Sequence, residues 1–217
     1  MADRAVLVEF GTAQGAPVHA AVLALDRRLA AQPCDGFVEA VPAFVNLLVV
    51  FDPLVTDAAA VTLHLHGLLT QAVAEPDAVA LREVLVCYDA DLAPDLPEVA
   101  DRCGLTMDAV IAAHLAGEYA VAMYGFAPGY AYLSGVPEAL RLDRKPQARR
   151  GVAAGSVLIA AGQCLVSTLV MPTGWWIIGQ SPTRVLTGDA VRPFLFDVGD
   201  RVQFRRISRA EFDRGAP

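Results

Sequence analysis

The chain has 217 residues and a formal net charge of −7, from 24 acidic and 17 basic residues. This negative charge argues against nucleic acid or an anionic membrane as the main partner. Hydrophobic residues make up 55% of the chain, but no apolar run approaches the ~20 residues of a membrane span, and the first residues show no export signal, so we expect a cytoplasmic protein.

The first eighty residues predict a small α+β domain. Residues rich in β-branched and aromatic types predict strands at 5–10, 37–41 and 46–51. Apolar residues at helical spacing predict helices from Val18 to Leu29 and from Val61 to Ala72. The order β-α-β-β-α lets two helices cover one face of an antiparallel sheet.

Three details of this first domain can be read from single residues. Thr56 or Asp57 is available as the N-cap of the second helix, and Glu75-Pro76-Asp77 is expected to close the domain. His64 falls on the apolar face of that helix, where a histidine is usually packed and hydrogen-bonded. The expected domains are 1–80 and 81–217.

Past Asp77 the pattern predicts a strand at 83–87, a helix at 96–102 and a second helix capped by Thr106. Gly117 occupies the place where a left-handed residue would end that helix. The helix brings His114 close to the segment that follows. An imidazole there could transfer protons, because histidine titrates near neutral pH; a packed structural histidine is the alternative.

The segment 118–133 joins a predicted strand at 119–123 to a loop containing Gly125, Pro128 and Gly129. Glycine and proline shape such a loop, and four aromatic residues crowd it. The aromatics are Tyr124, Phe126, Tyr130 and Tyr132. A rigid aromatic loop suits the binding of a small polar ligand, whereas the alternative is a structural turn over a hydrophobic core.

From Gly151 onward, short apolar segments at 157–160, 164–170, 175–178 and 202–204 alternate with glycines. This spacing predicts a closed or nearly closed β-barrel, followed by a helical turn at 208–212. The fold class is therefore α+β, with a small N-terminal domain and a barrel domain.

Basic residues gather in two places of this acidic chain, and either group could steer an anion or form an ordinary solvated face. The first group is Arg141, Arg144, Lys145, Arg149 and Arg150, and the second is Arg201, Arg205, Arg206 and Arg209. The four cysteines are irregularly spaced, so we expect neither a metal site nor structural disulfides. No nucleotide-binding glycine loop is present.

Several of these motifs together resemble one family, the B subunit of bacterial 5-oxoprolinase, also labelled allophanate hydrolase subunit 1 and including a sporulation-kinase inhibitor. The most specific motif is the loop Gly125-Phe126-Ala127-Pro128-Gly129-Tyr130, continued by Tyr132-Leu133. Other matching residues are His114, Glu118-Tyr119, Arg149-Arg150, Ala154-Gly155-Ser156-Val157, Gly162-Gln163, Gly174-Trp175, Ile178-Gly179 and Gly199-Asp200-Arg201-Val202. The likeness spans nearly the whole chain.

The resemblance implies a cyclophilin-like β-barrel behind the α+β domain and a carboxyltransferase-like domain. It also implies ATP-dependent opening of the cyclic amide 5-oxoproline to glutamate, in a complex with a homologous C subunit and an A subunit. The implied catalytic residues are His114, Arg150 and Gln163, and the implied substrate-binding residues are Tyr124, Phe126, Pro128, Gly129 and Arg149. Arginine forks suit phosphate or carboxylate oxygens.

The chain departs from the family after Gly162-Gln163. The family continues there with Thr-Gly-hydrophobe-Tyr-Pro, whereas this chain has Cys164-Leu165-Val166-Ser167-Thr168, and Met171-Pro172-Thr173 replaces Ser-Pro-Gly before Gly174-Trp175. Either the substrate differs or part of the chemistry is lost, and Cys164 is either a reactive thiol or a buried one. A regulator of a histidine kinase and an allophanate hydrolase subunit remain alternative functions.

Overall fold

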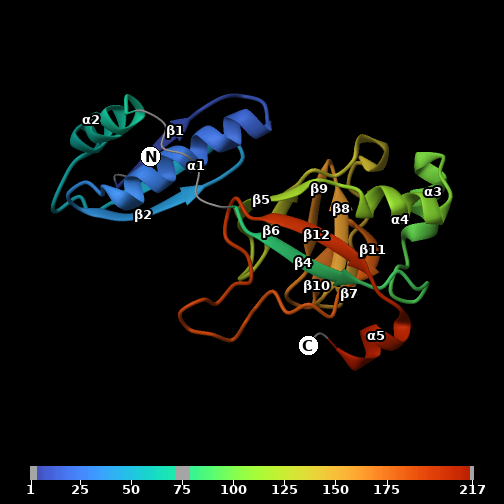
Figure 1. Cartoon of the computed structure of the whole chain (residues 1–217). Helices are drawn as coiled ribbons and strands as arrows, with labels where there is room; N and C mark the ends of the chain where they lie inside the picture. The colour runs from blue at the N-terminus through green and yellow to red at the C-terminus, as the bar shows by residue number, and fades with distance from the viewer. Residues whose placement is uncertain (1–3, 72–78, 216–217) are drawn as a thin grey trace. The chain divides into compact units, whose positions relative to one another are not determined.

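The structure, a computed structural model, describes residues 4–71 and 79–215. The chain divides into two compact units, Met1–Ala78 and Val79–Pro217, which are described separately; the path of each can be followed in Figure 1. Among the described helices, none combines the length and the apolar character needed to cross a membrane.

The first unit is a three-stranded antiparallel sheet with two helices. Its elements are β1 (Ala5–Glu9), α1 (Ala16–Ala31), β2 (Phe37–Pro42), β3 (Asn46–Phe51) and α2 (Ala58–Leu69), with strand order β1-β3-β2. Alternate residues of β3, Leu47, Val49 and Phe51, are buried in one cluster with apolar residues of both helices. Since alternate strand residues share a face, both helices cover the same side of the sheet, as predicted.

The structure tests the predictions made for single residues of this unit. The Asp57 side chain caps α2 by accepting a hydrogen bond from Ala60 N at 2.8 Å. His64 is half-buried and its Nε2 lies 2.8 Å from Gln32 O, so it is hydrogen-bonded at the edge of the core. Ala72 and Glu75-Pro76-Asp77 lie outside the described residues.

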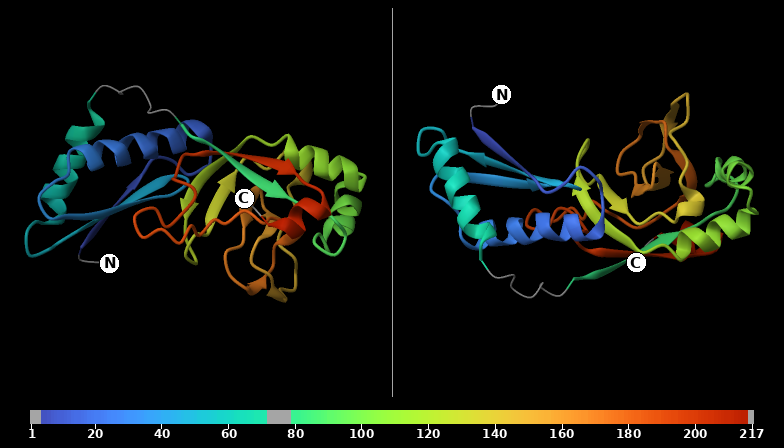
Figure 2. Two further views of the ribbon diagram at one scale, coloured as in Figure 1. Left: turned by 60° about the horizontal axis from the view of Figure 1, so that its bottom comes forward. Right: turned by 90° about the horizontal axis from the view of Figure 1, so that it is seen from above.

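The second unit is built on a seven-stranded sheet with the order β11-β8-β9-β6-β5-β12-β4. The seven strands are β4 (Leu81–Val86), β5 (Tyr119–Tyr124), β6 (Ala131–Ser134), β8 (Ser156–Ala160), β9 (Gln163–Val166), β11 (Trp176–Gln180) and β12 (Arg201–Arg206). Two further strands, β7 (Arg149–Val152) and β10 (Met171–Thr173), form a separate two-stranded sheet. The helices of this unit are α3 (Leu96–Cys103), α4 (Met107–Leu115), the 3₁₀ turn η1 (Glu138–Leu140) and α5 (Arg209–Arg214). Figure 2 shows the seven-stranded sheet curving back on itself.

A pair of hydrogen bonds between Cys87 and Gln180, both 2.9 Å, joins the two outermost strands and nearly closes the barrel. Gly179 permits this contact, because a Cβ there would lie 2.7 Å from Val86 Cγ1. The predicted α+β class with a nearly closed barrel is therefore confirmed.

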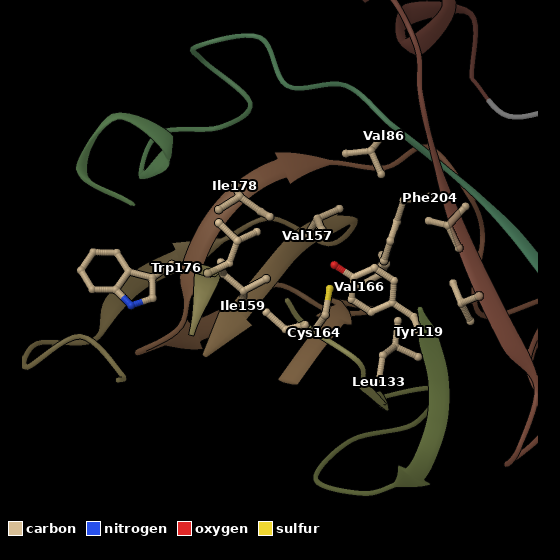
Figure 3. Close-up of a cluster of buried hydrophobic side chains, with 14 of the residues drawn as sticks. Val86, Tyr119, Leu133, Val157, Ile159, Cys164, Val166, Trp176, Ile178 and Phe204 are labelled. Atoms are coloured by element: carbon tan, nitrogen blue, oxygen red, sulfur yellow. The ribbon is translucent and has the colours of Figure 1, made fainter. Parts of the chain in front are cut away.

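The core of this unit fills the barrel interior. Val157 and Ile159 of β8 point inward and join the interior cluster shown in Figure 3, while Leu158 and Ala160 belong to a second buried cluster with Tyr130 and Trp175. Since alternate residues of a strand face opposite sides, the second cluster lies on the outer side of the sheet. The short hairpin of β7 and β10 supplies Val152 and Met171 to it.

Some local predictions for the second unit were wrong. Gly117 does not have a left-handed backbone. The helix α4 ends at Leu115 with Ala116 as its C-cap, and a Cβ at Gly117 would lie 2.5 Å from the Tyr119 ring. Close packing therefore requires this glycine. The predicted strand at 164–170 ends at Val166, and the pattern did not reveal β6, β7 or β10, which have only three or four residues.

Candidate functional site

The aromatic loop, residues 125–130, connects β5 to β6 and is held by its own backbone. Gly125 N donates to Tyr130 O at 3.2 Å, and Tyr130 N donates to Ala127 O at 3.0 Å. From outside the loop, Thr168 Oγ1 donates to Pro128 O at 2.7 Å. These bonds fix the loop, so the predicted shaped conformation is what the chain adopts.

Phe126 occupies an unusual position at the tip of this loop. Its φ is 72°, in the left-handed region that residues with a side chain rarely adopt, and its side chain is 78% exposed. Its ring centroid lies 5.5 Å from that of Tyr130. Strained backbone of this kind occurs most often at ligand-binding and active sites, which makes Phe126 a candidate contact residue.

Gly129 places the loop against the rest of the barrel unit. Its φ is 73°, and a Cβ there would lie 2.7 Å from Leu186 Cδ2 and 3.1 Å from Thr168 Cγ2. The loop therefore packs onto both segments. Any larger residue at Gly129 would displace it.

Beside the aromatic loop, Tyr124 lines a pocket of about 300 Å³ together with Arg192, Phe194, Phe196 and Asp197. Tyr124 donates its hydroxyl hydrogen to Phe196 O at 2.8 Å, and its ring stacks on Phe194 with centroids 5.1 Å apart. Burial, with the nearby carboxylates of Asp197 and Asp200, raises the pKa of Tyr124, so the phenol stays protonated. An aromatic wall beside the Arg192–Asp197 ion pair of 3.2 Å suits a small polar ligand.

His114 lies in the barrel interior and is fully buried. Its Nδ1 is 2.7 Å from the Tyr88 hydroxyl, its Nε2 is 3.6 Å from Cys164 Sγ, and its ring lies 4.4 Å from that of Phe204. Burial lowers the pKa of His114 to about 3 and raises the pKa of the Cys164 thiol. Both groups are neutral near pH 7, which favours packing roles for both over proton transfer and thiol chemistry.

The depressed pKa of His114 predicts a pH effect on stability. The unfolded chain binds a proton at this histidine near pH 6.5, whereas the folded chain does so only near pH 3. Stability therefore falls as the pH drops through this window, by roughly 1 to 2 kcal/mol between pH 6.5 and 5. Urea denaturation at both pH values should show this loss in wild type and not in His114→Gln. Equal pH dependence of stability in the two proteins would show that folding does not lower the pKa of His114.

Arg149 and Arg150 of β7 have different surroundings. Arg149 Nη1 lies 3.5 Å from Asp95 Oδ1, and Lys145 Nζ lies 2.5 Å from Asp95 Oδ2. As the next residue along a strand, Arg150 points to the opposite side. It is exposed, and within residues 4–71 and 79–215 no ion pair engages its guanidinium. Arg150 is thus free to bind an anion, while Arg149 is already paired.

Gln163 lies apart from the aromatic loop. It is the first residue of β9, and its neighbour Cys164 pairs with Leu133 near the end of β6, whereas the loop leads into the start of β6 at Ala131. The structure thus brings together Tyr124, Phe126, Pro128 and Gly129. It leaves Gln163 and His114 elsewhere in the barrel.

Sequence reasoning missed the pocket wall formed by Arg192, Phe194, Phe196 and Asp197. These residues precede β12 in a long segment without a helical or strand pattern. The two phenylalanines and Pro193 were a weak signal of packing, but no pattern in the sequence indicated that they contact Tyr124.

Comparison with known proteins gives a consistent result. Residues 1–196 match the family described as "Carboxyltransferase domain, subdomain C and D". The chain is 34% identical over 224 residues to the 5-oxoprolinase B subunit of Bacillus subtilis, an alignment that covers 98% of this chain and 93% of that protein. It is 35% identical to the protein of the same name from Escherichia coli O157:H7, covering 83% of this chain and 82% of that one.

Solved structures agree with these matches. The crystal structure of TTHA0988 superposes with a TM-score of 0.82 at 36% identity, covering 94% of this chain and 40% of that one. PH0987 from Pyrococcus horikoshii, at 34% identity and a TM-score of 0.59, covers 98% of both chains. The urea amidolyase of K. lactis shares the fold at 16% identity, with a TM-score of 0.76 over 97% of this chain and 15% of that one. The chain therefore belongs to the carboxyltransferase domain C and D family that includes the 5-oxoprolinase B subunits.

Proposed function

We propose that the chain is the B subunit of an ATP-dependent 5-oxoprolinase, which opens 5-oxo-L-proline to L-glutamate together with a C subunit and an A subunit. The observation that carries the proposal is the 34% identity to the Bacillus subtilis B subunit over 98% of this chain. The arrangement of the aromatic loop, which contains the most specific shared motif, supports it.

The chemistry explains why such a reaction needs ATP. The ring amide of 5-oxoproline is unactivated, and transfer of a phosphoryl group from ATP to its oxygen supplies a leaving group. We assign the use of ATP to the complex as a whole.

In this proposal, the aromatic loop and Tyr124 form the apolar surface against which the ring lies, and Arg150 holds phosphate or carboxylate oxygens. Arg150 is exposed and unpaired in the described part of the chain, and a guanidinium fork suits both groups. Phe126, Pro128 and Gly129 shape the loop. Arg149 contributes less to this surface than Arg150, because it points to the other side of β7 and pairs with Asp95. Gln163 would have to orient an amide from another part of the barrel, and a proton-transfer role for His114 is disfavoured by its burial.

The test is reconstitution. This chain is co-expressed with homologues of the C and A subunits, the complex is purified, and ATP hydrolysis and glutamate release are measured with 5-oxo-L-proline. We expect turnover that depends on 5-oxoproline and disappears when this chain is omitted. An assembled complex that ignores 5-oxoproline, or equal turnover without this chain, would refute the proposal.

A further inference from the structure

A second pocket of about 280 Å³ lies in the barrel unit, outside the site described above. Arg102 of α3, Arg141 and Arg144 of the segment after η1, and Trp176 of β11 line it, and Asp143 contributes the one carboxylate among its lining residues. We call it the cationic pocket. Figure 3 shows the Trp176 indole at the margin of the interior cluster.

The structure divides the basic cluster seen in the sequence into parts with different roles. Lys145 and Arg149 share the single carboxylate of Asp95. Arg141 and Arg144, by contrast, have no carboxylate partner among the described residues; Arg141 Nε donates to Val136 O at 3.3 Å, and the Arg144 guanidinium lies 5.6 Å from the Trp175 ring. In a chain of net charge −7, this pocket concentrates unpaired positive charge.

The third guanidinium is oriented by a tryptophan. Arg102 stacks over Trp176, 5.0 Å from the ring centroid, while it also pairs with Glu98 at 2.8 Å. Trp176 is only 2% exposed, and its Nε1 donates to Asp143 O at 2.7 Å. One fixed ring therefore orients both Arg102 and the backbone between the other two arginines.

The segment that carries Arg141 and Arg144 is anchored on both sides. Leu142 O accepts a hydrogen bond from Ala161 N at 2.7 Å, and Lys145 N donates to Gly174 O at 2.7 Å. Because the backbone is already fixed, little conformational entropy would be lost when a ligand binds. The pocket is preorganised.

We propose that the cationic pocket binds a small anion through a carboxylate or phosphate group. Three arginines line this pocket, and guanidinium groups recognise both kinds of anion by charge-assisted, bidentate hydrogen bonds. The small volume selects an anion of the size of phosphate or a short amino or imino acid, and Leu142 and Pro146 give an apolar surface for the remainder. The site stands whether or not the proposed reaction is correct, because none of its residues is needed for that assignment.

The test uses the full chain and its own fluorescence. Trp175 and Trp176 are the only tryptophans in the sequence, and Arg144 lies over the first while the second lines the pocket. Inorganic phosphate, L-glutamate and 5-oxo-L-proline are titrated separately at constant ionic strength, with chloride as the reference salt. We expect a saturable fluorescence change with phosphate or with the carboxylates, and which of them binds identifies the group recognised.

Substitutions distinguish anion binding in this pocket from a nonspecific effect of added ions on the fluorescence. Arg141→Gln and Arg144→Gln should each weaken binding about tenfold or more, whereas Arg184→Gln, an exposed arginine of the same unit outside the pocket, should leave it unchanged. Circular dichroism checks that each variant is folded. No saturable change with any of the three anions, or equal binding by wild type and both pocket variants, would overturn the proposal.

Discussion

Gly135→Ala is expected to destabilise the barrel unit by about 3 kcal/mol or more. Gly135 follows β6 with a φ of 100°, and a Cβ there would lie 2.0 Å from the carbonyl oxygen of Glu118. The obstacle is backbone at the start of β5, so no side-chain rotation can relieve it. The substitution must either separate β5 from β6 or leave the residue in a strained conformation.

Urea denaturation followed by tryptophan fluorescence measures this loss, because both tryptophans lie in the barrel unit. Gly188→Ala is the matched control. Its φ is 78°, but among the described residues, apart from its two chain neighbours, no atom lies within 4 Å of an added Cβ. This variant therefore carries the backbone strain alone, about 1 to 2 kcal/mol. If Gly135→Ala lost no more stability than Gly188→Ala, the close approach of Glu118 would not be a real constraint.

Arg150→Ala is expected to lower the turnover of the reconstituted complex about 100-fold without dissociating it. The reason is that removal of one side chain that stabilises a developing negative charge typically costs on the order of 10²- to 10³-fold in rate. Steady-state ATP hydrolysis and glutamate release measure the effect, and size-exclusion chromatography shows whether the complex is intact.

Two further variants make this result specific. Arg184→Ala removes an exposed positive charge elsewhere in the barrel unit and should be neutral. Arg149→Ala should lower turnover less than Arg150→Ala, because Arg149 is already engaged with Asp95 at 3.5 Å. Turnover by Arg150→Ala near the wild-type level, with an intact complex, would remove Arg150 from the site.

The candidate site was only partly predictable. The loop from Gly125 to Tyr130 could be found because glycine, proline and aromatic residues interrupt a strand pattern at close spacing, and such a signal is local. The positions of His114 and Gln163 could not. Helical spacing placed His114 on an apolar face, but whether that face meets the loop or the barrel interior depends on how α4 packs against β12 and the Tyr88 side chain.

The basic cluster at residues 141–150 is a second case in which the sequence could not show the partners of the side chains. The sequence shows five basic residues within ten positions, but not which of them have partners. Asp95, some fifty residues earlier in the chain, pairs with both Lys145 and Arg149. Trp176 and Arg102 complete a pocket around Arg141 and Arg144. A long-range contact thus decides which charges remain available.

By itself, the sequence determined the class of fold, the order of elements in the first unit, the barrel of the second and the family, because periodicity, glycine punctuation and a shared motif are all local patterns. Tertiary structure alone decided the burial of His114, the pairing of Arg149, the wall beside Tyr124 and the closure of the barrel between Cys87 and Gln180. These depend on contacts between residues far apart in the chain, whose partners no local pattern specifies.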